Sequence, residues 1–567
     1  MYRAWHRVAD AVKAEFVAGL AEEWGNHSVA VWQDQIDHFW EIYWVLGPEE
    51  AEGKEGAWLD ARKNWRSYRM PDQGGEHCTL MGEWQEISGF SRVGKRAQRD
   101  IFWEHLRARN TLDLREGERL CSIALVKRLF PMTNKLGEAI GWIPGGEPAA
   151  TRAWPSTGHV AAATWLADIA QHSEIVAACA KLSDYVHGNL SARHFSEQHA
   201  RIRCVRDNSG RFGNAAHSFA TLDANFMRLD DIVNLRSLPL FDKRGEPLDE
   251  GADRIHRTKI RDLHEAIKES IKRVNEQTAT NPKVKYPEPP PYYALLSMDG
   301  DKVGELLNGK QDDAVSLALA DFTGEVAALF GMRNGARAAA NGVAIYAGGD
   351  DVLALTTVED AIPAAMQLAE GYRRAFERRD VKTKAGETPD ISAAIVFADH
   401  HEAFRDVTGE AHRLLERVAK EGNGRASLAI GVQKSSGQAA EWVGKWWLGK
   451  DIEPPKLLLK LAAGRGYSNR FPYNLRARYI APAMGGFDKI GFSNADIQKI
   501  FGYELGKSRD QDGAPVDERD DMGAMAILSR PASLQPYSPE PGAHAAGLSE
   551  SGLLVVRFLD QYGVWRS

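Results

Sequence analysis

The residues of this chain best suited to chemistry are two adjacent carboxylates, Asp350 and Asp351, which follow Gly348 and Gly349 in the stretch 341–355, NGVAIYAGGDDVLAL. Apolar runs on both sides of the glycines predict a β-hairpin with the carboxylates at its tip. Two like charges this close raise each other's pKa unless a cation lies between them. Hard cations such as Mg²⁺ take oxygen ligands and often share them with substrate phosphates. The stretch is therefore either a metal-dependent phosphate site or an ordinary solvated acidic turn.

A second acidic strand end lies about fifty residues earlier. The apolar run 292–298, YYALLSM, predicts a strand that leads into Asp299, Gly300 and Asp301. If the chain stays extended, Asp299 and Asp301 point to the same side, although Asp301 could instead cap the next helix. The start of that helix, near Gly304, would offer free backbone N–H groups to a phosphate. The predicted metal ligands are accordingly Asp299, Asp301, Asp350 and Asp351.

The order of predicted elements gives the fold class. It is strand 292–298, helix about 301–332, strands 343–347 and 351–357, helix about 359–378 and strand 391–398. This β-α-β-β-α-β order is the ferredoxin-like arrangement, which is also the topology of nucleotidyl-transferase palm domains. We therefore expect an α+β protein with a catalytic palm.

A further helix over 402–420 and a strand over 426–432 follow the palm. Lys420 and the pair Gly424-Arg425 resemble a Lys and a Gly-Arg pair of nucleotide cyclases with this fold. Lys420 could pair with a triphosphate, or it could only complement the dipole of its helix. The predicted nucleotide-binding residues are Gly300, Asp301, Gly304, Gly348, Gly349 and Lys420.

Composition excludes several classes of protein. With 567 residues and a net charge of -7, the chain is long enough for about three or four domains and is not a globally basic nucleic-acid binder. Any RNA contact must be a local patch within a larger assembly. Charged residues throughout 1–20 and the lack of a long apolar run predict neither signal peptide nor membrane span, so the cytoplasm is the expected compartment. Four scattered cysteines argue against a disulfide framework.

The domain organisation follows from composition along the chain. The run 39–46, FWEIYWVL, reads as a buried strand, and Pro155-Ser156-Thr157 predicts the cap of a long helix to about 187. Charged residues predict a helix over 250–278, and 549–561 reads as a final amphipathic helix. The expected parts are an aromatic-rich 1–73, an insertion over 74–135, a mainly helical 136–290 with a Pro-rich linker, the palm at 291–440 and a helical 441–567.

Four motifs together resemble one family. They are GERLCSIALVKR at 117–128, WPST at 154–157, DGD at 299–301 and GGDD at 348–351. In this order they are similar to the large, palm-containing (Cas-ten family) subunit of type III CRISPR-Cas effector complexes, of the Cmr (III-B) type. The resemblance extends from about residue 32 to about residue 437. It also implies a degenerate palm-like domain earlier in the chain, to which the run 39–46 would contribute a strand.

The resemblance implies an antiviral function. A palm of this family converts ATP to cyclic oligoadenylate second messengers when a guide RNA pairs with a target RNA. Two ions, Mg²⁺ or Mn²⁺, would stabilise the attacking and leaving oxygens. Asp350 and Asp351 resemble the family's metal-binding pair, and Asp299 its first-strand ligand. The implied partners are guide (CRISPR) RNA, target RNA and the other subunits of a Cmr complex.

Two departures from the family pattern matter. The HD nuclease domain of many members needs an adjacent His-Asp pair, and no His-Asp dipeptide occurs here, so we expect no DNase activity. The family's zinc site has two C-x-x-C pairs. Here the second cysteine of each pair is replaced, by Met81 in the pair that begins with Cys78 and by Ala124 in the pair that begins with Cys121. Tetrahedral zinc needs four ligands and His77 would substitute only with unusual geometry, so we expect no zinc there.

Two other functions stay open. A diguanylate-cyclase-like enzyme acting on GTP shares the hairpin, but that class usually follows GGD with Glu, whereas this chain has Asp351. The chain could also be a scaffold that holds guide RNA and neighbouring subunits and carries an inactive palm.

Overall fold

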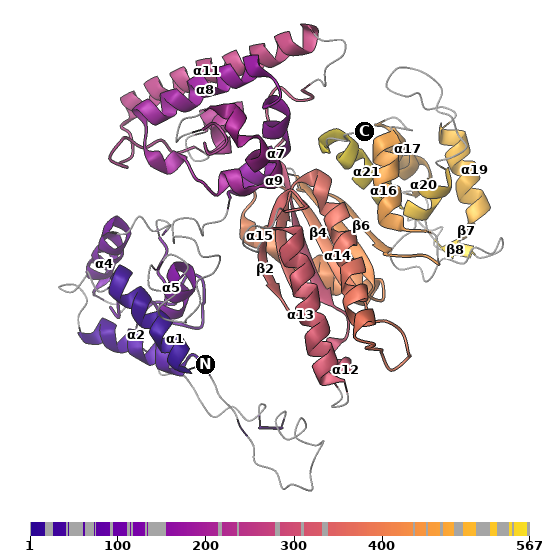
Figure 1. Ribbon diagram of the computed structural model, residues 1–567, viewed down its shortest axis with the longest axis horizontal. Coiled ribbons are helices and arrows are strands. Elements are labelled where there is room, and N and C mark those ends of the chain that lie inside the picture. The colour runs from indigo at the N-terminus through magenta and orange to yellow at the C-terminus, as the bar shows by residue number, and fades with distance from the viewer. Residues whose placement is uncertain are drawn as a thin grey trace. The chain divides into compact units, whose positions relative to one another are not determined.

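A computed structural model divides the chain into two compact units, Met1–Ala153 and Trp154–Ser567 (Figure 1). The residues described are 2–17, 26–40, 44, 61–62, 73, 75–90, 94–109, 114, 117–130, 133, 155–213, 218–234, 238–277, 284–307, 311–331, 338–434, 437–449, 452–464, 469–480, 491–505, 522–529, 544–546 and 549–563.

The first unit is helical in its described part. Its helices are α1 (Tyr2–Val12), which continues as a π-helical turn, α2 (Asn26–His38), α4 (Arg96–Arg109) and α5 (Ser122–Leu129). They enclose a core that contains the buried rings of Trp32 and Trp103. The described residues of this unit form no strand ladder, only an isolated bridge between His77 and Gln85.

The predicted strand over 39–46 is wrong where the structure describes it. Phe39 and Trp40 follow the end of α2 outside any strand, and Trp44 is 70% exposed. Phe39 packs instead on Trp5 of α1, with ring centroids 4.9 Å apart, because an aromatic run can bury its rings against a helix without pairing its backbone. Residues 41–43 and 45–46 lie outside the described part, and the degenerate palm-like domain stays a prediction.

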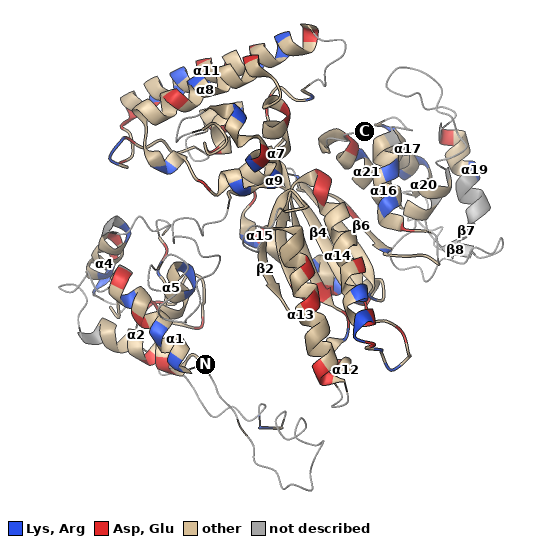
Figure 2. Cartoon of the chain, viewed as in Figure 1, with Lys and Arg blue, Asp and Glu red and all other residues tan. Residues whose placement is uncertain are grey.

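The second unit begins with helices. Its main members are α7 (Thr157–Ile169), α8 (Ser173–Asn189), α9 (Arg203–Asn208), α10 (Leu229–Val233) and α11 (Glu250–Gln277). Ser156 caps α7, since its side chain accepts a hydrogen bond from the backbone N–H of His159 at 3.1 Å, as predicted. The single helix expected to residue 187 is two helices, with a break at 170–172 where His172 takes an extended conformation. The charged helix over 250–278 is confirmed as α11, which lies beside α8 with Lys and Arg interspersed among Asp and Glu (Figures 1 and 2).

The sheet of this unit has the predicted ferredoxin-like core. Its strands are β1 (Tyr292–Gly300), β2 (Gly342–Gly348), β3 (Asp351–Thr356), β4 (Ile391–Asp399), β5 (Ser427–Lys434) and β6 (Gly437–Lys445). The first four lie in the order β2-β3-β1-β4 and pair antiparallel, which confirms the β-α-β-β-α-β reading. β5 adds parallel to β4, and β6 adds antiparallel to β5. The sheet thus continues to Lys445, so residues 441–445 are strand rather than part of the helical segment expected after residue 440.

Helices cover both faces of the sheet. They include α12 (Val303–Leu306), α13 (Asp312–Leu329), α14 (Val358–Arg378) and α15 (Phe404–Arg413), the last continuing as a π-helix over Leu414–Gly422. α13 and α14 lie side by side over one face, while α7 and α15 contact the other (Figure 1). Alternate residues of β1 belong to different cores, Ala294 and Leu296 to one and Tyr293 and Leu295 to the other. A strand buried on both faces reads as a continuous apolar run, which is why the sequence revealed it.

The predicted helix over 301–332 is interrupted. α12 is a single turn, and Leu307 after it is extended, with φ of −80° and ψ of 93°. α13 begins only at Asp312, and its apolar face packs on α14.

The final part of the chain packs against the sheet. Its elements are α16 (Pro454–Gly464), α17 (Phe471–Leu475), β7 (Gly491–Ser493), α19 (Asn494–Leu505), α20 (Met522–Leu528), β8 (His544–Ala546) and α21 (Ser551–Tyr562). The predicted final amphipathic helix is confirmed as α21, which contacts β6 and α16. Among the described residues, no helix combines the length and the apolar character that crossing a membrane requires.

Candidate active site at the hairpin and the end of β1

The GGDD stretch forms the predicted hairpin. Gly348 pairs with Asp351 across the end of β2 and β3, which leaves Gly349 and Asp350 as a two-residue turn. Gly349 has a φ of 67°, a conformation that favours glycine and that the first turn position of a type II′ hairpin requires. A side chain at Gly348 would collide with the hydroxyl of Tyr346. The two glycines therefore fix the turn that carries the carboxylates.

Three of the predicted carboxylates meet at this edge of the sheet. β1 and β3 are neighbours, with Met298 opposite Val352, so Asp299 and Asp351 leave adjacent strands side by side. Burial and then a hydrogen bond with Asp299 raise the pKa of Asp351 to about 6. A Cβ built on Gly300 would lie 2.8 Å from the Cβ of Asp350, whose pKa is raised by burial and by the charge of Asp299. The two acidic strand ends that sequence reasoning singled out are thus brought together.

Lys420 supplies a positive charge at the same place. Its ammonium group donates hydrogen bonds to Asp299 Oδ2 and, at 2.7 Å, to Glu416 Oε1, and the residue is 9% exposed. Burial alone would lower its pKa, but the hydrogen bonds with these carboxylates outweigh burial and raise it, so Lys420 stays charged. It lies in the π-helical segment Leu414–Gly422, and such local widening of a helix is frequent at functional sites. Its side chain points at the carboxylates of the acidic edge, so Lys420 does more than complement the dipole of its helix, which was the alternative role considered from the sequence.

Asp301 does not join Asp299 at the contact with Lys420. It follows the end of β1, and its carboxylate accepts hydrogen bonds from Ser392 Oγ and the backbone N–H of Ala426, both at 2.8 Å. It does not cap α12, because the N-cap position is Lys302, which has a φ of 56° and makes no side-chain cap bond. Burial raises the pKa of Asp301 to about 6. Asp301 therefore ties the end of β1 to the loop before β5.

That loop is strained. Arg425 and Ala426 have φ values of 65° and 46°, and each non-glycine residue in this region costs about 1–3 kcal/mol. The Nζ of Lys445 donates to the carbonyls of Gly424, at 3.0 Å, and Arg425, at 2.5 Å. Together with Asp301, Lys445 holds the Gly424-Arg425 pair next to the carboxylate edge.

The expected phosphate site at the start of a long helix is not formed as predicted. Gly304 lies in α12, which is only four residues long, and the left-handed Lys302 precedes it. So short a helix has few aligned N–H groups and a weak dipole. A Cβ at Gly304 would meet nothing within 4 Å, so this glycine is not required by close contact.

Sequence reasoning missed Tyr372. It lies on α14, fully buried, and its hydroxyl would be 2.5 Å from a Cβ on Gly300. The hydroxyl has no hydrogen-bond partner among the described residues. Burial, and then the charges of Asp350, Asp301 and Asp299, raise its pKa. Helical periodicity indicates that Tyr372 faces the core, but only the fold shows that its hydroxyl reaches the acidic edge.

The residues at this edge fit a hard divalent cation. Asp299, Asp350 and Asp351 offer oxygen atoms, and burial and then neighbouring carboxylates raise the pKa values of the last two. A buried hydroxyl without a partner beside them fits a metal-bound water.

Two cysteines from the degenerate zinc motifs also come together. Cys78 and Cys121 are both buried and free, and a hydrogen bond with Cys121 lowers the pKa of Cys78 to about 6. Met81 Sδ lies 3.9 Å from Cys121 Sγ. The two remaining cysteines of the motifs thus lie close together, and Met81 and Ala124 occupy the motif positions of the other two cysteines.

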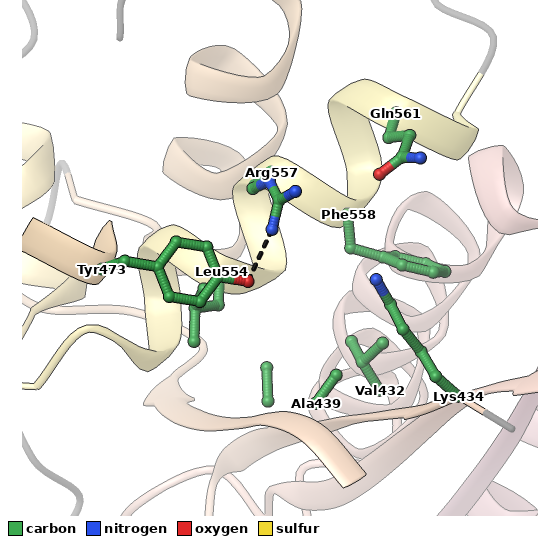
Figure 3. Close-up of a pocket in the computed structure, with 9 residues that line it drawn as sticks. Val432, Lys434, Ala439, Tyr473, Leu554, Arg557, Phe558 and Gln561 are labelled. Carbon is green, nitrogen blue, oxygen red and sulfur yellow. Dashed lines mark hydrogen bonds between the residues drawn. The ribbon is translucent and has the colours of Figure 1, made fainter. Parts of the chain in front are cut away.

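A small hollow elsewhere contains none of the predicted site residues. It lies between β5, β6 and α21 and has room for little more than a water molecule, about 20 Å³ (Figure 3). Lys434 lines it, as does Arg557, which donates to Tyr473 Oη at 2.6 Å (Figure 3).

Comparison with known proteins agrees with this arrangement. The family described as Cas10/Cmr2, second palm domain, matches residues 292–429. The curated protein "CRISPR system Cmr subunit Cmr2" of Pyrococcus furiosus is 27% identical over 246 residues, a match that spans 39% of this chain and only 27% of that protein. A chain in the cryo-EM structure of the Type III-B Cmr-beta bound to cognate target RNA shares the fold, with a TM-score of 0.50 and 12% identity over 99% of this chain and 68% of its own length. Residues 292–429 of this chain therefore match the second palm domain of the Cas10/Cmr2 family, and the chain is similar to a Cmr2 subunit over part of that protein's length.

Proposed function

We propose that this chain is the palm-containing subunit of an RNA-guided type III-B (Cmr) antiviral effector complex and that its palm converts ATP to cyclic oligoadenylates. The observation that carries the proposal is the meeting of Asp299, Asp350 and Asp351 with Lys420 at one edge of the sheet. Nucleotidyl transfer needs this combination, since carboxylates hold metal ions and a cation pairs with phosphate.

The charged residues of the acidic edge would have different roles in the reaction. Asp299, Asp350 and Asp351 would hold two Mg²⁺ or Mn²⁺ ions, which when bound stabilise charge on the attacking and leaving oxygens. Lys420 neutralises Asp299 in the metal-free protein and is placed to turn to a triphosphate when Asp299 takes a metal. Asp301 is a positioning residue for the Gly424-Arg425 loop and a further candidate ligand.

The glycines leave space for the nucleotide. The nucleotide-binding residues proposed are Gly300, Asp301, Gly304, Gly348, Gly349 and Lys420. Gly300 is required by the packing of the site itself, because any side chain there would overlap Tyr372 and Asp350 and displace the carboxylate edge. Gly304 has the weakest structural reason, because the space around it is open.

The proposed partners are guide RNA, target RNA and the other subunits of a Cmr complex in the cytoplasm. With a net charge of -7, the chain would bind RNA through local patches, held in place by its neighbours.

The test uses the assembled complex with guide and target RNA, ATP or GTP, and Mg²⁺ or Mn²⁺, with products separated by chromatography. We expect cyclic oligoadenylates from ATP, and their loss in Asp350→Asn/Asp351→Asn with assembly unchanged. The matched control is Asp312→Asn/Asp313→Asn, which removes an adjacent carboxylate pair at the start of α13 and should leave product formation intact. Products from GTP alone would instead support a diguanylate-cyclase-like enzyme. Assembly with no product in the wild type would support a scaffold with an inactive palm.

A further inference from the structure

A second cluster of metal-ligand side chains lies away from the acidic edge. Asp231 belongs to α10, and His400 and His401 directly follow β4. One potential ligand atom from each residue lies within 4.8 Å of the other two. His400 Nε2 is 3.0 Å from Asp231 Oδ2, and His401 Nε2 faces Asp231 Oδ1. Both imidazoles therefore direct the same nitrogen at the two oxygens of one carboxylate.

The other nitrogen of each ring faces an acceptor. His401 Nδ1 lies 2.9 Å from Asp399 Oδ1, and His400 Nδ1 lies 3.3 Å from the carbonyl oxygen of Pro291. In the metal-free protein Nε2 of each ring also faces an acceptor, the Asp231 carboxylate, and so carries a proton. A metal ion would displace that proton from Nε2, while the acceptor at Nδ1 keeps a proton on the other nitrogen. Histidines that bind metals show this arrangement, with the remote N–H held by a carboxylate or a backbone carbonyl.

Burial gives the cluster one closed side and one open side. Asp231 is fully buried and the His400 side chain is 4% exposed, whereas the His401 side chain is 43% exposed. A buried carboxylate is costly without a nearby cation. Arg228 is 4.0 Å from Asp231 Oδ2, but it also donates to the carbonyls of Gly158, Pro289 and Pro290. Its charge is therefore shared, and the side of His401 leaves access for an ion and a water ligand.

We propose that Asp231, His400 and His401 bind one divalent transition metal of the Zn²⁺ class. Two imidazoles and a carboxylate form a ligand set that zinc uses, with a fourth position for water. Mg²⁺ and Mn²⁺ prefer oxygen ligands and would go to the acidic edge. This site and the acidic edge lie at opposite ends of the paired strands β1 and β4. Asp399, next to the histidines, pairs with Tyr292, whereas Asp299 at the acidic edge pairs with Ser392, about 23 Å away along the strands.

The metal would join two parts of the second unit. Asp231 comes from the helices before the palm, and both histidines come from the end of a central palm strand. A shared ion would fasten α10 to β4 and stabilise the folded unit by mass action. The inference stands whether or not the palm makes cyclic oligoadenylates.

The test measures zinc binding by the full chain. The parent protein carries Asp350→Asn/Asp351→Asn, which removes the carboxylate pair of the palm. The parent, the parent with His401→Ala and a control with His412→Ala, an exposed histidine of the adjoining α15, are dialysed against Zn²⁺ and analysed for metal. We expect one zinc per chain in the parent and in His412→Ala, and affinity weaker by roughly tenfold or more in His401→Ala. Zinc should raise the thermal midpoint only in the proteins that bind it.

A spectroscopic measurement needs no variant at this cluster. Co²⁺ in the parent protein should give the visible absorption of a nitrogen and oxygen site without a thiolate charge-transfer band. The proposal is overturned if no zinc is retained, or if His401→Ala binds as tightly as the parent. It is also overturned if zinc is lost with Cys78→Ser rather than with Asp231→Asn, since the ion would then belong to the thiol pair.

Discussion

Lys420 donates a hydrogen bond to the carboxylate of Asp299, although 121 residues separate them in the sequence. The contact places a fixed positive charge at the edge where Asp350 and Asp351 also lie. Lys420 therefore offsets only part of the negative charge that the carboxylates concentrate at this edge. In the proposed function the same ammonium group would pair with a phosphate.

Lys420→Ala should reduce cyclic oligoadenylate formation by about 100-fold or more, roughly 3 kcal/mol of transition-state stabilisation. The reason is that the phosphate loses its cation while Asp299 keeps its metal-binding oxygens. The rate of ATP turnover by the assembled complex, compared between Lys420→Ala and the wild type, measures this loss. Arg417→Ala removes an exposed cation from the same helical segment and should leave turnover unchanged. Equal turnover in Lys420→Ala and Arg417→Ala would show that Lys420 is only structural.

Stability of the metal-free protein should depend on pH through Asp351. Its folded pKa of about 6 lies above the ordinary 3.8, so the folded state binds more protons than the unfolded state between these values. Stability therefore falls as pH rises from about 4 to about 6. Asp351→Asn should reduce this slope without abolishing it, because Asp301 has a similarly raised pKa.

The same titration predicts the pH dependence of metal binding. Mn²⁺ needs ionised carboxylates, so its effect on the thermal midpoint should appear as pH rises through about 6. Asp351→Asn should lose most of this response. Thermal midpoints measured across this pH range, with and without Mn²⁺, give both results. A slope that is the same in Asp351→Asn and in the wild type would contradict the raised pKa.

Gly300→Ala should abolish most activity at a moderate cost in stability. The new methyl group would lie 2.5 Å from the Tyr372 hydroxyl and 2.7 Å from a Val303 methyl group. Overpacking of this kind costs about 1–3 kcal/mol and would displace the carboxylates. Gly304→Ala, in the open turn of α12, should be neutral or slightly stabilising. Denaturant unfolding and ATP turnover compare the two, and equal behaviour would refute the packing argument.

Tyr372→Phe should leave the stability of the metal-free protein unchanged or raise it by up to about 1 kcal/mol. The change removes a buried hydroxyl without a partner among the described residues. If the hydroxyl binds a metal-bound water, the variant should also need more Mn²⁺ for half-maximal activity. Tyr293→Phe removes another such buried hydroxyl, on β1 in the opposite core, and should not change the Mn²⁺ requirement. A Mn²⁺ requirement that rises equally in both variants would exclude a specific role for Tyr372.

The sequence predicted the palm well because each of its strands carries a local signal. The strands over 292–298 and 391–398 are buried on both faces and read as unbroken apolar runs, and Gly348-Gly349 marks the turn. Helix continuity was harder to predict. The break at 170–172 contains neither proline nor glycine, so no strong local signal marked it. After Leu307, the dipeptide Asn308-Gly309 is a turn signal in the sequence that the prediction of one helix over 301–332 overlooked.

By itself, the sequence determined the β-α-β-β-α-β order, the hairpin and the acidic strand ends, because these depend on residue patterns a few positions long. Only the tertiary structure decided that Lys420 reaches Asp299, that Tyr372 lies beneath Gly300, and that Asp231 meets His400 and His401. The physical reason is that such contacts join segments far apart in the chain. Strand order and packing bring these segments together, and no local pattern records which side chains will meet.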